Sequence, residues 1–510
     1  MWKTSLLPKV LTLGVLSILI QAPGHHADDL IRTTESGRIQ GTQISIKEID
    51  KGVNIFLGIP FAKPPVGALR FSPPQPPDSW SNVRDATSHP PACLQDITLL
   101  EKMAKFTKMK ILTTANSEDC LYLNVYVPVH VKERAKLPVM VWIHGGGLTF
   151  GSASIYDGSI LSASQNVVVV TIQYRLGVLG FFSTGDEYAP GNWGYLDQVA
   201  ALKWVHKNIA HFGGDPDLVT IFGESAGGRS VSSHVLSPMS KGLFHRAIME
   251  SGVAIYAGFI SSSSEKVVNI IANLSACDRH NSSSMVQCLR NKSEDEILNI
   301  TKHFKRIRGV IDGHFFPKQP EDLLAGGDFN HVPSIIGVNN DEFGWVLPVE
   351  IGIIGLKENM NKSSIQSALQ NLFLGFPPEL VRLVMEEYLK DTEDPGEYRA
   401  QFLEMLGDFM FAIPSLKVAK YQRVLGEGTE EEKLLSHRIM SYWANFARHG
   451  DPNGADLFHW PVYDQKEEYL QLNLQLSVGT SLKKDKFEFW TKTLPEKMKE
   501  LQREKSRLDL

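Results

Sequence analysis

The sequence has few of the features that would indicate a membrane, a nucleic acid or a metal ion as a partner. Its formal net charge is −5, so it lacks the basic surface that nucleic-acid binding requires. No apolar run is long enough to span a bilayer, and no cluster of metal-ligating side chains is evident. No proline- or serine-rich linker, low-complexity tract or internal repeat divides the 510 residues. These absences predict one large globular domain over residues 28–510.

The N-terminus predicts a signal peptide over residues 1–27. Lys3 and Lys9 form a basic start, Val10–Ile20 is an apolar run of signal-peptide length, and small residues follow up to Ala27. An anchor that stays attached is the alternative. Five glycosylation sequons agree with a secretory route, with their asparagines at Asn273, Asn281, Asn291, Asn299 and Asn361. We expect the endoplasmic reticulum lumen or secretion, because the last residues, Arg507–Leu510, are only loosely similar to a retrieval signal.

The most informative stretch is a Gly-x-Ser-x-Gly pattern centred on Ser225. It follows a strand-like run, Leu218–Phe222, and precedes Arg229–Leu236, which reads as a helix that ends before Pro238. A sharp turn between a strand and a helix is the setting of a nucleophile elbow, where small residues such as Gly223 and Gly227 let the serine hydroxyl stand clear. The pattern predicts that Ser225 is a nucleophile.

A second glycine-rich stretch predicts an oxyanion hole. The apolar strand Val139–Ile143 opens directly into His144-Gly145-Gly146-Gly147. A tetrahedral oxyanion needs preorganised N–H donors about 3 Å away, and glycines allow that backbone approach. We expect the amides of Gly145, Gly146 and Ala226 to supply these donors. A plain glycine-rich turn is the alternative, and the order and spacing relative to Ser225 argue against it.

The spacing of apolar runs predicts an α/β fold. Strand-like runs recur at 139–143, 167–172, 218–222, 244–250 and 332–338, and helix-like segments such as Gln198–Ile209 lie between them. Strands that alternate with helices are typical of a mostly parallel sheet with helical crossovers. Residues 261–306 and 355–412 read as helical insertions that cap the site.

Three blocks resemble the type-B carboxylesterase/cholinesterase family, and within it most the carboxylesterase 2 subgroup. They are Ser117–Tyr126, His144–Gly147 and Gly223–Gly228, and the likeness runs over nearly the whole chain. The resemblance implies an α/β-hydrolase fold with helices on both faces of the sheet. It also implies disulfides Cys93–Cys120 and Cys277–Cys288, one of the three pairings that four cysteines allow.

The resemblance further implies a serine hydrolase of carboxylic esters. Its substrates would include xenobiotic and lipid esters with a small acyl group and a large alcohol, and no metal or organic cofactor is needed. By similarity to the family's Glu-Phe-Gly-Trp pattern, the triad acid is Glu342, with Asp341 as the neighbour to weigh against it. The acid would hold the histidine and stabilise the imidazolium. The oligomeric state is not specified.

The expected catalytic histidine has no counterpart in this sequence. In the family it lies in a loop after a core strand, which should fall between Tyr421 and Thr429, where the chain reads only Gln422–Gly428. The sequence therefore predicts an internal deletion that removes this strand and its histidine. After Glu342 only His437, His449 and His459 remain, and each reads as structural or solvated. A catalytically impaired variant and a non-catalytic binding protein are the alternatives to an active ester hydrolase.

Overall fold

The computed structural model describes most of the chain from residue 30 onward. The described residues are 30–47, 49–98, 100–101, 104, 115–255, 260–304, 307–343, 360–372, 378–390, 394–422, 435–455, 457–472 and 476–508. Three predicted features lie outside these residues. They are the signal peptide, the deletion junction after Gln422, and the start of the helix that follows this junction. No helix of the described part combines the length and apolar character needed to cross a membrane.

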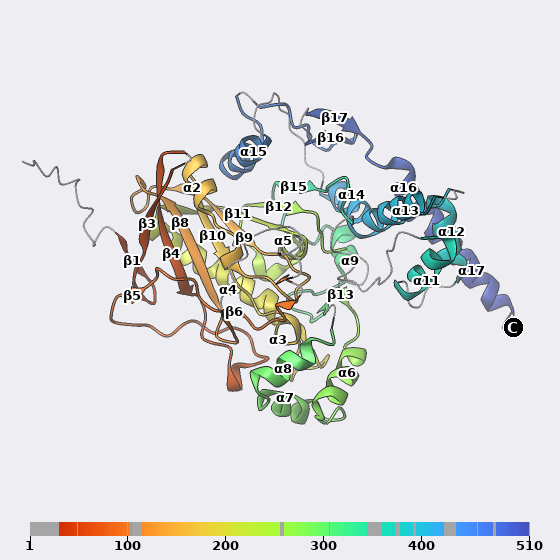
Figure 1. Ribbon diagram of the computed structural model, residues 1–510, viewed down its shortest axis with the longest axis horizontal. Coiled ribbons are helices and arrows are strands. Elements are labelled where there is room, and N and C mark those ends of the chain that lie inside the picture. Colours follow the sequence, from red (N-terminus) through yellow and green to blue (C-terminus); the bar gives the residue numbers. More distant parts are fainter. Residues whose placement is uncertain are drawn as a thin grey trace, which may run out of the picture.

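An eight-stranded sheet forms the centre of the molecule (Figure 1). In spatial order its strands are β15 (Ser334–Gly337), β12 (Arg246–Glu250), β11 (Gly214–Glu224), β9 (Leu137–Ile143), β10 (Val168–Ile172), β8 (Tyr122–Pro128), β4 (Lys51–Pro60) and β3 (Thr42–Ile46). The five strands from β15 to β10 are parallel, and β8, β4 and β3 continue antiparallel. The predicted mostly parallel sheet is confirmed.

Helices cover both faces of the sheet, which explains why its central strands are apolar throughout. On one face, α4 (Trp193–Asn208) and α5 (Ala226–Leu236) pack on β11 and β12 over the main apolar core. On the other, α2 (Ser159–Gln165) and α15 (Leu435–His449) pack over a second core that includes Trp142 and Phe222. The predicted α/β-hydrolase architecture is confirmed, and the core of β9 to β12 is closed from both sides.

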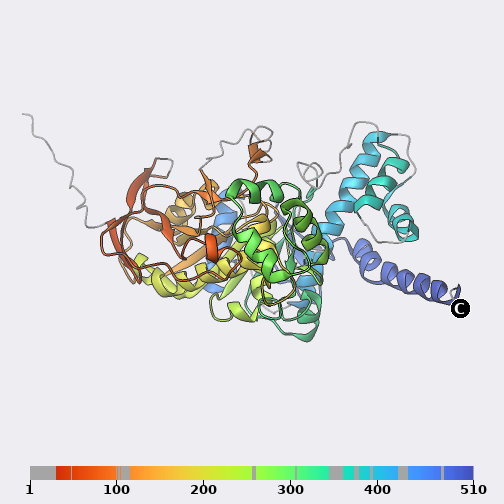
Figure 2. The ribbon, with the colours of Figure 1, turned by 90° about the horizontal axis from the view of Figure 1, so that it is seen from below.

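Helices gather in two further groups. The first group follows β12: α6 (Glu265–Ser275), α7 (Ser282–Arg290) and α8 (Glu294–Thr301), the last opened by a capping box between Ser293 and Glu296. The second group consists of α11 (Lys362–Leu372), α12 (Pro378–Tyr388), α13 (Pro395–Gly407), a π-helical turn (Asp408–Ala412), α14 (Ile413–Tyr421), α16 (Lys484–Glu488), a second π-helical turn (Phe489–Thr493) and α17 (Leu494–Leu508). This second group lies beside the β15 end of the large sheet (Figure 1). Helix α17 projects away from the sheet and its covering helices toward the C-terminus (Figure 2).

Further short strands and α-helices of the described residues lie around these. They are β1 (Ile31–Thr34), β2 (Gly37–Gln40), β5 (Arg84–Asp85), β6 (Ala92–Cys93), β7 (Asn116–Ser117), β13 (Ile260–Ser261), β14 (Gly309–Val310), β16 (Glu468–Gln471), β17 (Ser477–Thr480), α3 (Gly177–Phe181) and α9 (Pro320–Gly326). The late pair β16 and β17 forms its own two-stranded sheet. Within the described residues, therefore, β15 is the edge of the large sheet, on the side where the sequence predicts that a strand is missing.

Candidate active site

Ser225 occupies a strained turn between β11, which ends at Glu224, and α5, which begins at Ala226. Its backbone has φ 55° and ψ −117°, a conformation that a residue with a β-carbon rarely adopts. Two hydrogen bonds hold the turn: the Ser225 amide donates to the Glu250 carbonyl at 2.9 Å, and the Arg229 amide donates to the Ser225 carbonyl at 2.9 Å. This geometry is that of a nucleophile elbow.

The glycines on either side of Ser225 are needed because α5 starts directly against β9. A β-carbon on Gly227 would lie 2.0 Å from the carbonyl oxygen of Ile143, and one on Gly223 would lie 2.4 Å from the same atom. Neither separation is possible for a real side chain. The two motif glycines therefore bring the elbow onto the carboxyl end of the neighbouring strand, where the second glycine-rich stretch begins.

The loop after β9 lies against Ser225. Gly146 has φ 103° and Gly147 has φ 63°, both in the region that favours glycine. A β-carbon on Gly145 would lie 3.3 Å from the β-carbon of Ser225 and 2.7 Å from the Glu224 carbonyl oxygen. The structure thus brings together the two glycine-rich stretches that the sequence singles out.

His144 supports this loop through packing and hydrogen bonds. Its ring is buried, stacks on Tyr174 with centroids 4.4 Å apart, and has Nδ1 2.9 Å from the Gly145 carbonyl oxygen. The Tyr174 hydroxyl donates to the His144 carbonyl at 2.7 Å. Burial lowers the pKa of His144 to about 4, so the ring is neutral at physiological pH. The residue holds the backbone of the loop.

Glu342 lies five residues beyond β15 and turns inward, whereas its neighbour Asp341 is exposed. The Asn339 amide donates to Glu342 Oε1 at 2.7 Å, and the Asn339 side chain donates to Ser251 Oγ at 3.2 Å. Burial raises the pKa of the Glu342 carboxyl, and hydrogen bonds from Ser251 and Asn339 act in the opposite direction. Of the two acids, Glu342 is the one held in the interior.

The helical group beside β15 reaches the site at two points. A β-carbon on Gly407, at the end of α13, would lie 3.7 Å from the β-carbon of Glu342. The guanidinium of Arg229 lies over the Phe411 ring, 5.5 Å from its centroid. Arg229 follows the motif directly but is not among the predicted site residues. Its positive charge partly offsets the rise in the pKa of Glu342 that burial causes.

No hydrogen bond joins a histidine to Ser225 or Glu342 among the residues that the structure describes. His449, at the end of α15, is exposed, and His459 is half-buried. The side chain of His437 lies outside the described residues. His234 is fully buried between Gln198 and Ser240, at 2.9 and 2.7 Å, and burial lowers its pKa to about 3. The predicted absence of a triad histidine stays a prediction.

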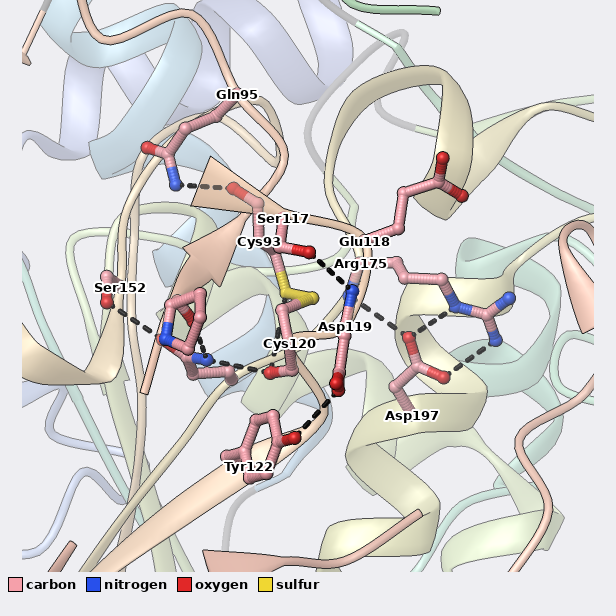
Figure 3. Close-up of a disulfide and its surroundings, with 12 residues drawn as sticks. Cys93, Gln95, Ser117, Glu118, Asp119, Cys120, Tyr122, Ser152, Arg175 and Asp197 are labelled. Carbon is pink, nitrogen blue, oxygen red and sulfur yellow. Dashed lines mark hydrogen bonds and ion pairs between the residues drawn. A yellow bond between two sulfur atoms is a disulfide. The ribbon is translucent and has the colours of Figure 1, made fainter. Parts of the chain in front are cut away.

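Both disulfides implied by the resemblance are formed, Cys93–Cys120 and Cys277–Cys288. Figure 3 shows the first, which ties the Ser117–Tyr126 block to the strand β6. Beside it, Arg175 donates two hydrogen bonds to the Asp197 carboxylate, at 2.8 and 2.7 Å, and both side chains are buried. Disulfides indicate folding in an oxidising compartment, which places the chain in the secretory pathway.

The remaining predicted site residues lie on the surface. All five sequon asparagines are exposed: Asn273, Asn281, Asn291, Asn299 and Asn361. Asn281 and Asn361 also accept a hydrogen bond through Oδ1 from the amides of Ser284 and Ser364, both at 2.9 Å. Within the described ranges, no three histidine, cysteine or acidic side chains are close enough together to hold a metal ion.

The sheet order, the strained serine after a parallel strand and the glycine loop beside it define an α/β-hydrolase of the serine-esterase class. Comparison with known proteins gives the family. The family model described as "Carboxylesterase family" matches residues 28–428 and 422–490, and this chain belongs to that family. It is an ester hydrolase.

Individual relatives are similar over almost their whole length. A cocaine esterase from Homo sapiens is 52% identical over 97% of each chain. An acylcarnitine hydrolase from Mus musculus is 52% identical over 96% of each chain, and a pyrethroid hydrolase from Rattus norvegicus is 51% identical over 96% of this chain and 94% of its own. The alignment with the human protein spans 541 positions, 31 more than the 510 residues here.

Proposed function

We propose that this chain hydrolyses carboxylic esters by acyl transfer through Ser225. Ser225 Oγ attacks the ester carbonyl, and the amides of Gly145, Gly146 and Ala226 stabilise the oxyanion, while Glu342 serves as the acid of the site. The observation that carries the proposal is the position of the strained Ser225 against the Gly145 loop. Backbone amides fixed before the reaction stabilise charge that develops in the transition state.

The substrates are proposed from the names of the relatives. These are called hydrolases of cocaine, acylcarnitines and pyrethroids, so small-molecule esters are the class to test first. We expect a preference for a small acyl group and a large alcohol. The non-catalytic alternatives are not favoured, because these relatives carry the names of enzymes.

We infer that family residues are missing at the junction 422–428, the expected histidine among them. Two observations support this: the family model matches in two stretches that overlap at this junction, and the human relative has positions without a counterpart here. Loss of one triad member typically lowers turnover by about 10⁶, with about 10³–10⁴ over water remaining. Turnover of this chain should accordingly be far below that of a complete triad.

The cellular location is proposed as the endoplasmic reticulum lumen or the exterior. The glycans would be at the exposed sequons, and the chain would act as one domain from residue 28 onward. Deglycosylation of the protein isolated from cells, followed by mass measurement, tests both the removal of residues 1–27 and the occupancy of the sequons.

The decisive experiment is turnover of a small-acyl chromogenic ester by the purified chain beside its Ser225→Ala variant, with and without added imidazole. Imidazole can enter a site that lacks its histidine and accept the serine proton. We expect imidazole to raise the turnover of the wild type in a saturable manner and that of Ser225→Ala only by the free reaction in solution. Equal turnover of both proteins under both conditions would contradict the proposal.

A further inference from the structure

A hollow lies between α6 and α8, in the helical group that follows β12. The two helices pack against each other (Figure 1), and a space of about 220 Å³ remains between the end of α6 and one face of α8. Leu274 and Ser275 line it from α6, and Asn299 and Ile300 line it from α8. Sites for drug-sized ligands occupy about 300–1,000 Å³, so this hollow suits a smaller group, such as a single sugar ring.

The lining combines apolar and charged side chains. Leu274 is 40% exposed, although it is a large apolar residue, and Ile300 beside the same space is buried. Lys292 Nζ lies 2.9 Å from Glu296 Oε1, and both of these side chains also line the hollow. A sugar ring presents C–H groups on its faces and hydroxyl groups around its edge. Apolar side chains can cover the ring faces, and charged side chains can hydrogen-bond the hydroxyl groups.

Asn299 is the sequon asparagine that lines the hollow. It lies in the last turn of α8, its side chain is exposed, and it begins the sequon that ends at Thr301. His303, a further lining residue, has Nδ1 2.9 Å from the Asn299 carbonyl oxygen, so its ring stays beside the attachment point. The asparagines of the other four sequons are all described, and they do not line this space. A glycan on Asn299 would therefore begin at the wall of the hollow.

A glycan attached at this position needs little intrinsic affinity for the hollow. A group held by a short tether has an effective concentration in the millimolar range, so a site with a dissociation constant of about 1 mM is already substantially occupied. Contact with Leu274 also removes apolar surface from water, which favours the packed state. The position of the attachment point thus compensates for the small size of the hollow.

We propose that Asn299 carries an N-linked glycan whose first N-acetylglucosamine packs into this hollow and holds the end of α6 against α8. Such a glycan requires entry into the secretory pathway and is independent of ester hydrolysis. In the transfer, Asn299 Nδ2 bonds to C1 of a sugar carried on a lipid diphosphate. The bond between C1 and the diphosphate oxygen breaks, Nδ2 loses one proton, and the lipid diphosphate leaves.

The test uses the full chain isolated from cells that add only high-mannose glycans. Mass measurement of its peptides gives the occupancy of Asn299, and hydrogen exchange reports on the amides of residues 270–275 and 296–301. We expect Asn299→Gln to raise these exchange rates by about tenfold, because the two helix ends then separate more often. The matched control is Asn273→Gln, which removes a sequon from an exposed position of α6 and should change the rates by less than about threefold.

Two further measurements separate the sugar from the asparagine side chain. Trimming with endoglycosidase H leaves one N-acetylglucosamine on each glycosylated asparagine, and the trimmed protein should keep the exchange rates of the untrimmed protein. Leu274→Ala should raise the rates in the glycosylated chain and add less than about twofold in the Asn299→Gln background. A role of the asparagine side chain alone would make the two substitutions additive.

The outcomes also separate this inference from the other proposals. An unmodified Asn299 in a chain that carries a glycan at another sequon would overturn the inference and leave the proposed glycosylation intact, whereas unmodified asparagines at all five sequons would overturn both. A glycosylated Asn299 with Asn299→Gln exchange rates within about threefold of the wild type would also overturn it. None of these readouts depends on turnover, so the proposed hydrolysis stands or fails on its own experiment.

Discussion

Replacing Gly227 by alanine perturbs the contact on which the candidate site is built. The new β-carbon would lie 2.0 Å from the Ile143 carbonyl oxygen and 3.1 Å from the carbonyl carbon of His144. Ordinary contact begins near about 3.5 Å, so α5 and the end of β9 must separate by about 1.5 Å. Both contacting atoms are backbone, so no side-chain rotation relieves the overlap.

The magnitude follows from two opposing effects. Overpacking of a buried contact costs about 1–3 kcal/mol, and a clash with backbone belongs at the upper end. Alanine in place of glycine in a helix contributes about 1 kcal/mol in the other direction. The net expectation is a loss of about 2 kcal/mol in the free energy of unfolding. Because the glycine loop moves by more than 1 Å relative to Ser225, turnover should also fall by about 10²-fold.

The assay is urea denaturation followed by tryptophan fluorescence, together with turnover of a chromogenic ester. Gly337→Ala is the control, since no heavy atom lies within 4 Å of a β-carbon built there. It should change the free energy of unfolding by less than about 0.5 kcal/mol. Wild-type stability and wild-type turnover in Gly227→Ala would refute the close approach of α5 to β9.

Three further predictions concern charge and cross-links. Burial raises the pKa of the Glu250 carboxyl. The contribution of Glu250 to the free energy of unfolding is therefore full below the ordinary carboxyl pKa and is lost as the pH rises through the raised pKa. Glu250→Gln should accordingly raise the melting temperature at pH 8 more than at pH 5. Arg175→Met leaves the buried Asp197 without its ion-pair partner and should cost about 3–5 kcal/mol by urea denaturation, most of which Asp197→Leu recovers in the double variant. Replacing Cys277 and Cys288 together by serine should cost about 2–3 kcal/mol and expose α6 to α8 to limited proteolysis, whereas equal cleavage rates would argue against that bond as a local tie.

Local patterns explain why much of the fold could be predicted from the sequence. The runs 139–143, 167–172 and 218–222 became β9, β10 and β11, and Gln198–Ile209 falls largely within α4. Buried parallel strands need apolar residues on both faces, which leaves a continuous signal in the sequence. The elbow was predictable for a similar reason. Gly223 and Gly227 are both required by the close approach of the turn to the Ile143 carbonyl oxygen, so a short sequence motif is enough to indicate it.

Contacts between distant segments could not be predicted in this way. The ion pairs Arg175–Asp197 and Arg70–Glu118 join residues that no periodicity relates. The same holds for Glu224: its place inside the motif was visible, but its nearness to Gly145 depends on the register of β11 against β9. Charged side chains become informative only once the fold shows which of them are buried together.

The site divides into two parts according to the strands that carry it. Ser225 follows β11 and the Gly145 loop follows β9, and both are inner strands of the sheet. Helices α4 and α5 cover one face of the sheet, and α2 and α15 cover the other. Glu342 follows β15, which is the sheet edge within the described residues. The predicted loss of a segment beyond β15 would remove the base and expose an edge, but it would leave the nucleophile and the glycine loop on strands that keep both neighbours.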